Sequence, residues 1–374
     1  MTRIFGFVTA IVSAACSWGA PCPSGYGWYQ SITIVAAKVS SGPYNHLPLL
    51  LPLSNSNLAT VANGGKVQNS NGYDIIVSDT SGNKLNFELV GHSTQTTYVA
   101  TTGAAEIWFD PGTGVDNGSV FNLCFGNASI STYQGNDTTV WSNGNYVFVV
   151  HAPNGTTLSM ADSGPNSIGV SSNTGTVTSG EIDGGVAYAS ASSQYTDYGT
   201  PSATRLTTIT TSFWVKNSDT GNRAPFSNEY SAGSSQGFAY AWNTAGAGKI
   251  RMFWAPGSVN VDSNSIASLN DGNWHYFAGE ATSTTPSFYW DGSSVGVSSG
   301  SPGSSLVYGT TNHLYTGRYT PGNYFNGSMD EIRVNSTTLS TGWLTTEFNN
   351  QSNPATFWTV GTLTSIGGIR HRVF

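Results

Sequence analysis

The chain has 374 residues, which is long for one domain and enough for two hydrophobic cores. Its 45 glycines and its background of Ser, Thr and Asn favour strands and tight turns over helices. A net charge of -7, with 9% charged residues and no basic stripe, excludes the phosphate contacts that nucleic-acid binding requires. We therefore expect an all-β protein that does not bind nucleic acid.

The first residues have the pattern of a secretory signal. Arg3 precedes an apolar run over 4–12, and the small residues at 13–15 suit a signal peptidase. The run is too short to span a bilayer, so it does not predict an integral membrane protein. We assign residues 1–20 to a signal peptide or an N-terminal hydrophobic segment. Lipid modification of Cys16 and an uncleaved, buried segment are the alternatives.

Three cysteines leave at least one thiol unpaired. Cys16 and Cys22 are a pair that an oxidising compartment would allow to bridge. Cys124 lies in a strand-like run, SVFNLCFGN, which favours a small buried hydrophobic side chain. The cysteine spacing contains no metal-binding motif.

Short apolar or alternating runs separated by Gly, Asn, Pro and Ser begin after Gly25, which is the pattern of antiparallel strands. In the first half they are SITIVAAKV, LPLLLPL, YDIIVSD, KLNFELV, EIWFD and VFNLCFGN. The spacing restarts with a strand over 146–151, so we place a domain boundary near Asn143. Residues 21–143 are then a first β-sandwich domain of unknown function.

The second half repeats the pattern in TITTSFWVKN, KIRMFWAP, NWHYFAGEAT, PSFYWDGSSV and YFNGSMDEIRV. Asp291 and Gly292 form an Asp-Gly pair that tolerates positive φ in a two-residue hairpin turn. So many short strands favour a second sandwich, a jelly roll, over 144–350. A C-terminal strand and tail follow over 351–374.

One segment, STGWLTTEFNN, has a helical pattern. Ser340 is a suitable N-cap, and Leu344 and Phe348 stand one turn apart, so that both can pack on the sandwich. We expect a single short helix here.

The segment YFNGSMDEIRV concentrates three charges in a chain with few of them. Because side chains alternate along a strand, Ile332 and Val334 predict a core face that Asp330 shares, while Glu331 and Arg333 face solvent. A buried carboxylate needs compensation by loop N–H groups or by a cation such as Ca²⁺. Both alternatives stay open for Asp330.

The motifs of the second half follow a defined order. WHYFAGEATSTTPSFYWDGSSV contains a Trp-His strand and a Tyr-x-Asp-Gly hairpin, and YFNGSMDEIRVNSTTLSTGWLTTEFNNQ contains a closing Asp-Glu-Ile-Arg strand with a short helix; DSGPNSIG and SSQYTDYG precede them. This set, over about residues 146–349, resembles the laminin-G-like, concanavalin A-like lectin family. The resemblance implies a two-sheet jelly roll, frequent Ca²⁺ at one rim, and loops that bind glycans or protein ligands.

Carried over residue by residue, the resemblance places Asp162 and Asp330 near one rim and so implies a Ca²⁺ site there. One departure weakens this expectation. Ala189, Ser190 and Ala191 stand where many family members have Phe-Asp-Gly, so one acidic ligand is missing. Any Ca²⁺ would then be weakly held.

A second set of pieces covers the first half, namely WYQSITI, LATVANGGKVQNSNGYDIIVSD, KLNFELVGH, AAEIWF, CFGNASISTYQGNDTTVW and NYVFVVH. These pieces resemble an uncharacterised β-domain of bacterial and archaeal surface proteins that often precedes a laminin-G-like module. Members are known for their architecture, so the resemblance implies fold and localisation and no chemistry.

Several features argue against catalysis. Glycoside hydrolases need two carboxylates about 5 to 10 Å apart, whereas Asp330 and Glu331 are expected on opposite faces of a strand. GSSQG, residues 233–237, matches Gly-x-Ser-x-Gly around Ser235, but a strand pattern, FAYAWN, follows where a nucleophile elbow needs a helix. No histidine lies in a zinc motif, and we expect His151 to have a satisfied ring rather than to act as a base.

Sugar binding uses aromatic rings that stack on pyranose C–H groups, beside polar groups that bind hydroxyls. Trp242, Trp254, Tyr319 and Tyr324 lie near predicted loops and are our candidate ligand-binding residues. The alternative for each of them is a place in the core, because two sandwiches must bury most of the 11 Trp and 17 Phe.

These observations predict a secreted or cell-surface protein that binds carbohydrate or mediates adhesion and has no catalytic activity of its own. Its expected partner is a glycan or another surface ligand. The first alternative is a self-assembling structural protein of a surface layer, an extracellular filament or a phage particle, with a lectin-like decoration domain. The second alternative is a glycoside hydrolase.

Overall fold

The computed structural model of the chain describes residues 20–93, 96–154, 157–228, 236–256, 259–282, 285–319 and 322–367. The predicted signal segment with Cys16, the Ser235 of GSSQG, and the basic end of the chain lie outside these residues. Within the described ranges, no helix is long and apolar enough to cross a membrane. Strands dominate and pair in antiparallel sheets, as the composition predicts.

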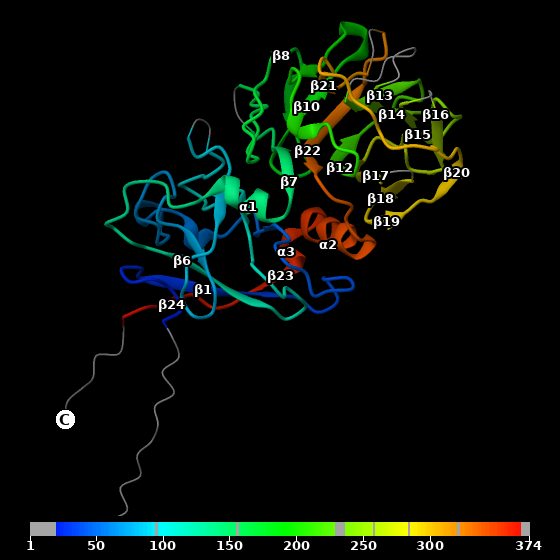
Figure 1. Cartoon of the computed structure of the whole chain (residues 1–374). Coiled ribbons are helices and arrows are strands. Elements are labelled where there is room, and N and C mark those ends of the chain that lie inside the picture. The colour runs from blue at the N-terminus through cyan, green and yellow to red at the C-terminus, as the bar shows by residue number, and fades with distance from the viewer. Residues whose placement is uncertain are drawn as a thin grey trace, which may run out of the picture.

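The first half folds into two sheets around one core (Figure 1). One sheet has the strand order β23-β1-β6-β3, with β24 also paired to β1, and the other has the order β2-β5-β4. The elements of this half are β1 (Trp28–Ile34), β2 (Leu49–Leu50), η1 (Ser56–Leu58), η2 (Val61–Asn63), β3 (Ile76–Ser78), β4 (Phe87–Leu89), β5 (Ile107–Phe109), β6 (Val120–Phe125) and α1 (Asp137–Asn143). Ile32, Phe87 and Leu123 meet in the core between the two sheets.

A disulfide joins Cys22 to Cys124 in this first domain, with their Cα atoms 5.9 Å apart. The bridge corrects two expectations, the pairing of Cys16 with Cys22 and the unbridged side chain at Cys124. Cys124 is fully buried on β6, and Cys22 precedes β1, which is the neighbour of β6 in the sheet. The two cysteines lie 102 positions apart in sequence, so only the folded sheet brings them together.

The second half is a sandwich of two eight-stranded sheets, the predicted jelly roll. One sheet has the order β19-β18-β17-β12-β22-β10-β9, with β7 also paired to β22; its strands are β7 (Tyr146–Val150), β9 (Thr176–Ser179), β10 (Gly184–Tyr188), β12 (Ile209–Lys216), β17 (Trp274–Ala281), β18 (Pro286–Trp290), β19 (Ser293–Ser294) and β22 (Gly327–Asn335). The other has the order β20-β16-β15-β14-β13-β21-β11-β8; its strands are β8 (Ser172–Asn173), β11 (Thr196–Asp197), β13 (Arg223–Asn228), β14 (Phe238–Trp242), β15 (Ile250–Trp254), β16 (Val259–Ser263), β20 (Val297–Ser299) and β21 (Leu314–Thr316). The turns η3 (Ser190–Ser192) and η4 (Ser202–Thr204) connect strands of this half.

The predicted hairpin and helix are both confirmed. Asp291 and Gly292 have φ values of +50° and +72° and join β18 to β19, as the two-residue turn requires. Helix α2 (Thr341–Ser352) begins after Ser340, whose hydroxyl accepts the N–H of Trp343 at 3.2 Å. Leu344 of this helix is fully buried.

The end of the chain returns to the first domain. After α2 and α3 (Pro354–Phe357), strands β23 (Trp358–Val360) and β24 (Thr364–Ser365) pair with β1, so that Ile32 lies opposite Val360. Figure 1 shows these red strands beside the blue β1. The jelly roll is therefore inserted between the first and the last strands of one sheet, and α2 lies at the junction.

Candidate functional site

A bulge interrupts the regular alternation of β22. Its pairing with β12 shifts between the Arg333–Ser212 and Asp330–Trp214 partners, so that two residues of β22 lie opposite one residue of β12. Glu331, inside the bulge, has φ +48°, in the left-handed region that non-glycine residues rarely adopt. The sequence prediction assumed unbroken alternation here.

The bulge changes which side chains of β22 face the core. Met329, Ile332 and Val334 all belong to the core of the jelly roll. Glu331 and Arg333, which we predicted to face solvent, are each 1% exposed and lie against the first domain, Glu331 near Glu106 and Arg333 over Trp108. That prediction is wrong because the first domain covers the face of β22 opposite Ile332 and Val334, the face to which alternation assigns both residues.

The two aspartates predicted as Ca²⁺ ligands are both held by backbone N–H groups. Asp330 accepts them from Ile182 and Glu331, and Asp162 accepts them from Val149, Gly164 and Ile168, at 2.7–2.9 Å. Burial raises the pKa of Asp162, and burial together with the charge of Glu331 raises the pKa of Asp330 well above its usual range. Both oxygens of each carboxylate are engaged, which is the alternative left open for Asp330, and Ca²⁺ at these residues stays a prediction.

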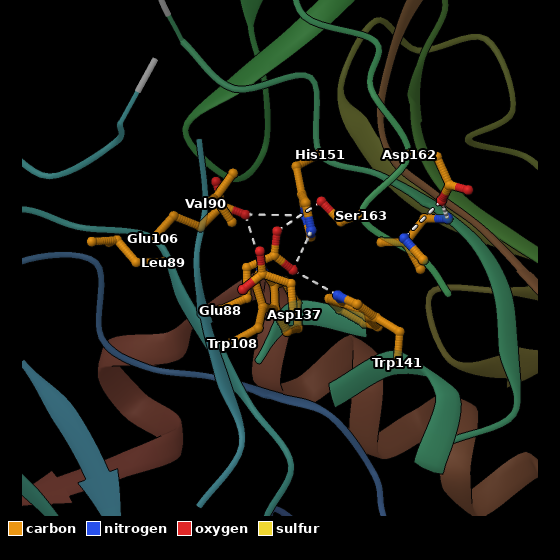
Figure 2. A network of polar contacts seen from close by, with 12 residues as sticks. Glu88, Leu89, Val90, Glu106, Trp108, Asp137, Trp141, His151, Asp162 and Ser163 are labelled. Carbon is orange, nitrogen blue, oxygen red and sulfur yellow. Dashed lines mark hydrogen bonds and ion pairs between the residues drawn. The ribbon is translucent and has the colours of Figure 1, made fainter. Parts of the chain in front are cut away.

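A cluster of titratable side chains that the sequence did not predict lies where β7 meets the first domain (Figure 2). His151 Nδ1 lies 2.7 Å from Glu331 Oε1 and 3.3 Å from Glu106 Oε1, and His151 Nε2 lies 3.3 Å from Glu88 Oε2. All four side chains are at most 3% exposed. Since Glu88 and Glu106 belong to the first domain and the other two to the second, the cluster joins the domains.

Arg333 extends this cluster. Its guanidinium bonds Glu331 and lies over the rings of Trp108 and Trp141, with Cζ 4.2 and 4.8 Å from the ring centroids. On its other side it lies 3.6 Å from Glu347 of α2. The arginine therefore stacks on rings of the first domain while it pairs with carboxylates of the second.

The charges of the cluster balance when one glutamate keeps its proton. Burial alone would raise the pKa of Glu331, but the charges of His151 and Arg333 outweigh it and lower that pKa to about 2. Burial and the charge of Glu331 raise the pKa of Glu106 to about 8. Burial opposes the charge on His151, yet Glu331 and Glu88 raise its pKa well above the usual value. At neutral pH, with Glu106 uncharged, His151 and Arg333 balance the carboxylates of Glu88 and Glu331 within the cluster, and Glu347 lies beside it, 3.6 Å from Arg333.

Glu106, His151 and Glu331 also have the residue types of a metal site, with one ligand atom of each within 4.8 Å of the others. Two contacts argue for a hydrogen-bonded cluster. The 2.7 Å between His151 Nδ1 and Glu331 Oε1 is a hydrogen-bond distance, and the guanidinium of Arg333 already neutralises Glu331. An ion is not needed to balance these charges.

A polar pocket of about 200 Å³ opens beside the cluster, between the two domains. Its lining comes from both halves of the chain and includes Glu88, His92, Asp137, His151, Ser159 and Ser163. Burial and the charge of Glu88 raise the pKa of Asp137 to about 7. Glu88 accepts hydrogen bonds from Ser163 at 2.7 Å and from Trp141 at 2.6 Å, so both of its oxygens are engaged.

Two of the four predicted ligand-binding residues are core residues. Trp242 on β14 and Trp254 on β15 are fully buried within the jelly roll, and the indole N–H of Trp254 donates to the carbonyl of Ser304 at 3.0 Å. Their rings offer no face to a ligand, so these two predictions are wrong. Both lie at strand ends, where proximity to a loop in sequence does not distinguish the inner from the outer face.

The outer face of the sheet β20–β8 carries the other two candidates. Tyr319 is half-buried and packs against Phe253, with ring centroids 5.2 Å apart. Tyr324 is half-buried and lies 6.2 Å from the ring of Tyr195. The structure thus brings both predicted tyrosines to one side of the jelly roll.

The strand register shows how this face is built. Consecutive partners across β15, β14, β13, β21 and β11 are Phe253, Ala239, Ser227, Tyr315 and Asp197. Aromatic side chains therefore flank two small ones in a row across the sheet.

Arg318 completes this face. Its Cζ lies 3.7 Å from the ring centroid of Tyr195 and 4.1 Å from that of Tyr315. We call Tyr195, Tyr315, Arg318, Tyr319 and Tyr324 the tyrosine–arginine face. Sequence reasoning quoted SSQYTDYG, which contains Tyr195, but did not single out that tyrosine or Arg318, since only the pairing of β11 with β21 brings them together.

Comparison with known proteins identifies the second half. Residues 190–344 match the model of the family described as the Concanavalin A-like lectin/glucanases superfamily. A search of curated protein sequences found no match.

Solved structures to which part of the chain is similar include domain 4 of AbnA, a GH43 extracellular arabinanase from Geobacillus stearothermophilus (15% identity, 54% of this chain and 86% of that one, TM-score 0.38). Others are the binding domain of Paraclostridial Mosquitocidal Protein 1 (13% identity, 55% and 52%, TM-score 0.37) and a SAP-like pentraxin from Limulus polyphemus (13% identity, 44% and 81%, TM-score 0.30). The match spans about half the length of the mosquitocidal binding domain. The segment 190–344 thus matches the concanavalin A-like lectin/glucanases family model, within a chain built of two β-sandwiches.

Proposed function

We propose that this is an exported carbohydrate-binding protein, whose jelly roll binds glycan on the tyrosine–arginine face without catalysis. The observation that carries the proposal is the gathering of Tyr195 and Tyr324 around Arg318, with Tyr319 on the same side of the domain. Tyrosine rings present an apolar face to sugar C–H groups and a hydroxyl to sugar oxygens. The family match of residues 190–344 supports the same ligand class.

The acidic residues of this face support a role in binding alone. Asp262 is paired with Arg251, and Asp197 is paired with His313. A glycosidase needs one carboxylate free to attack or to activate water and a second one that carries a proton. Side chains already committed to ion pairs do not supply that couple.

Export is supported by the disulfide between Cys22 and Cys124, because such bridges persist in oxidising compartments. A secreted or cell-surface location is accordingly part of the proposal. The first domain and its closing strands then act as a scaffold for the jelly roll.

A structural role is the second candidate, and two edge strands favour it. β9 and β20 end the two sheets of the jelly roll, and their Val177 and Val297 are both 41% exposed. Exposed edges can pair with another chain. Size measurement and electron microscopy of the purified protein test self-assembly.

A glycan screen with the intact purified protein, with and without Ca²⁺ and with chelator, tests the main proposal. We expect glycan binding and no release of reducing sugar. Loss of binding on chelation would support the predicted Ca²⁺ site at Asp162 and Asp330. Ordered assemblies without any glycan signal would support the structural role, and sugar release abolished by a single acidic substitution would overturn the non-catalytic assignment.

A further inference from the structure

We propose that the glycan bound on the tyrosine–arginine face is acidic, and that Arg318 binds its carboxylate or sulfate group. This inference rests on the proposed function and specifies its ligand. It depends on how Arg318 is stacked, how its backbone is held, and how the other charges nearby are paired.

Two tyrosine rings position the guanidinium of Arg318. Its Cζ lies 3.7 Å from the ring centroid of Tyr195 and 4.1 Å from that of Tyr315. The Arg318 side chain also has hydrogen-bond contacts with Tyr315 and Tyr324, and its Nε–H is buried without a partner among the described residues. Because a guanidinium carries five N–H donors, these contacts leave donors for a ligand.

The backbone around Arg318 is anchored on both sides. The Arg318 carbonyl accepts the hydroxyl of Ser227 at 3.0 Å, and Arg318 forms a β-bridge with Tyr324. The preceding Gly317 has φ +84°, and its N–H donates to Pro225 at 2.7 Å. A side chain held in this way loses little conformational freedom when it binds an anion.

The other cations of this sheet are already neutralised. Arg251 bonds both oxygens of Asp262, at 2.7 and 2.9 Å, and Arg223 pairs with Asp219 at 2.7 Å. In the part of the chain that the structure describes, Arg318 has no carboxylate within ion-pair distance. The face therefore carries one positive charge without an acidic partner, although the whole chain has a net charge of -7.

An anionic group on a sugar matches these features. A carboxylate or a sulfate accepts two parallel N–H bonds from a guanidinium, and charge assistance makes these bonds stronger than those to a neutral hydroxyl. The neighbouring half-buried Tyr195 and Tyr324 remain available for contact with the sugar ring. A neutral glycan would use the rings and leave the positive charge of Arg318 unpaired.

The test compares matched glycans on the intact protein. One pair is a uronic-acid oligosaccharide and its methyl ester, and the other is a sulfated oligosaccharide and its desulfated form; calorimetry at low and high salt measures the affinities. We expect at least one acidic form to bind about tenfold tighter than its neutral partner at low salt, with the difference shrinking as salt rises. The two pairs distinguish carboxylate from sulfate.

Arg318→Gln should abolish the preference for the acidic form over its neutral partner. Lys66→Gln is the matched control, because it removes one positive charge that also lies over an aromatic ring, Trp28 of the first domain. The thermal unfolding midpoint of each variant shows whether it is folded. Arg318→Lys keeps the positive charge but lacks the paired N–H donors of a guanidinium, so it should retain part of the preference for the acidic glycan.

Equal affinity for acidic and neutral forms in the wild type, or an unchanged preference in Arg318→Gln, overturns this inference while the proposed glycan binding stands. Binding to none of the four oligosaccharides overturns the inference, and the broader glycan screen then decides on the proposed function separately.

Discussion

Single side chains decide how the buried charges at the domain junction balance. Glu106 and Glu331 are both fully buried near His151, yet their pKa values are shifted in opposite directions, to about 8 and about 2. The charges of His151 and Arg333 lower the pKa of Glu331, whereas burial and the charge of Glu331 raise that of Glu106. A buried carboxylate without a cation of its own keeps its proton, and one that is paired releases it.

This assignment predicts the pH dependence of stability. Between the pKa of about 4.3 of a glutamate in the unfolded chain and the value of about 8 in the folded protein, folded Glu106 holds a proton that the unfolded chain releases. The contribution of Glu106 to the free energy of unfolding therefore falls as pH rises through this window. Glu106→Gln should flatten this fall, as measured by urea unfolding from pH 5 to 8.

Glu331→Gln should destabilise the protein, because it removes the carboxylate that pairs with His151 and Arg333 and leaves these two cations buried. We expect a loss of about 3 to 5 kcal/mol at neutral pH. The contribution of Glu331 is present above the unfolded-state pKa and is lost as pH falls toward about 2. An unchanged pH slope in Glu106→Gln would show that Glu106 is ionised in the folded protein.

At the scale of secondary-structure elements, β22 and α2 together form the junction. Glu331 and Arg333 lie on the face of β22 toward the first domain, and α2 supplies Glu347 to the same arginine. On the face of α2 toward the first domain, the side-chain amide of Asn350 bonds both the N–H and the carbonyl of Leu50. The helix is thus tied to both domains, so its stability matters to both.

The N-cap of α2 offers a direct test at this scale. Ser340→Ala removes the hydroxyl that accepts the Trp343 N–H and should lower the free energy of unfolding by about 1 kcal/mol. Ser352→Ala, at the last residue of the same helix, is the control and should change stability by less. Equal effects of the two substitutions in chemical denaturation would contradict the capping role.

At the scale of the whole molecule, the first domain encloses the jelly roll in sequence. Its sheet contains β1 at the start and β23 and β24 at the end of the described chain (Figure 1). The disulfide joins the segment before β1 to β6. Both closures depend on pairings between residues far apart in the chain. The strand pairing and the disulfide therefore hold together the parts of the first domain that come before and after the jelly roll in sequence.

Removal of the disulfide should weaken this arrangement. The double variant Cys22→Ala, Cys124→Ala should lose about 2 to 5 kcal/mol of unfolding free energy. A reductant should destabilise the wild type and leave the double variant unchanged. Equal stability of wild type and variant under oxidising conditions would show that the bridge does not stabilise the folded protein.

Local patterns predicted much of the fold, because strands, the Asp291–Gly292 hairpin and the capped helix depend on neighbours in sequence. The bulge at Glu331 depends on register with β12, and the Cys22–Cys124 bridge depends on the order of strands in a sheet, so neither was predicted. Among the predicted ligand-binding residues, Tyr319 and Tyr324 reach the surface, whereas Trp242 and Trp254 are buried. The sequence did not separate them, because the inner face of a strand is defined by the sheet that packs on it.

The central claim is that the jelly roll binds glycan on the tyrosine–arginine face, and the most direct measurement compares the affinity of wild type and Tyr324→Ala for a glycan found in the screen. We expect the variant to bind about tenfold more weakly or worse, because an aromatic ring at the centre of a sugar site carries much of the binding energy. Tyr29→Ala, at a half-buried tyrosine on β1 of the first domain, should bind as the wild type does. Equal affinity of Tyr324→Ala and wild type, with both proteins folded, would contradict the account.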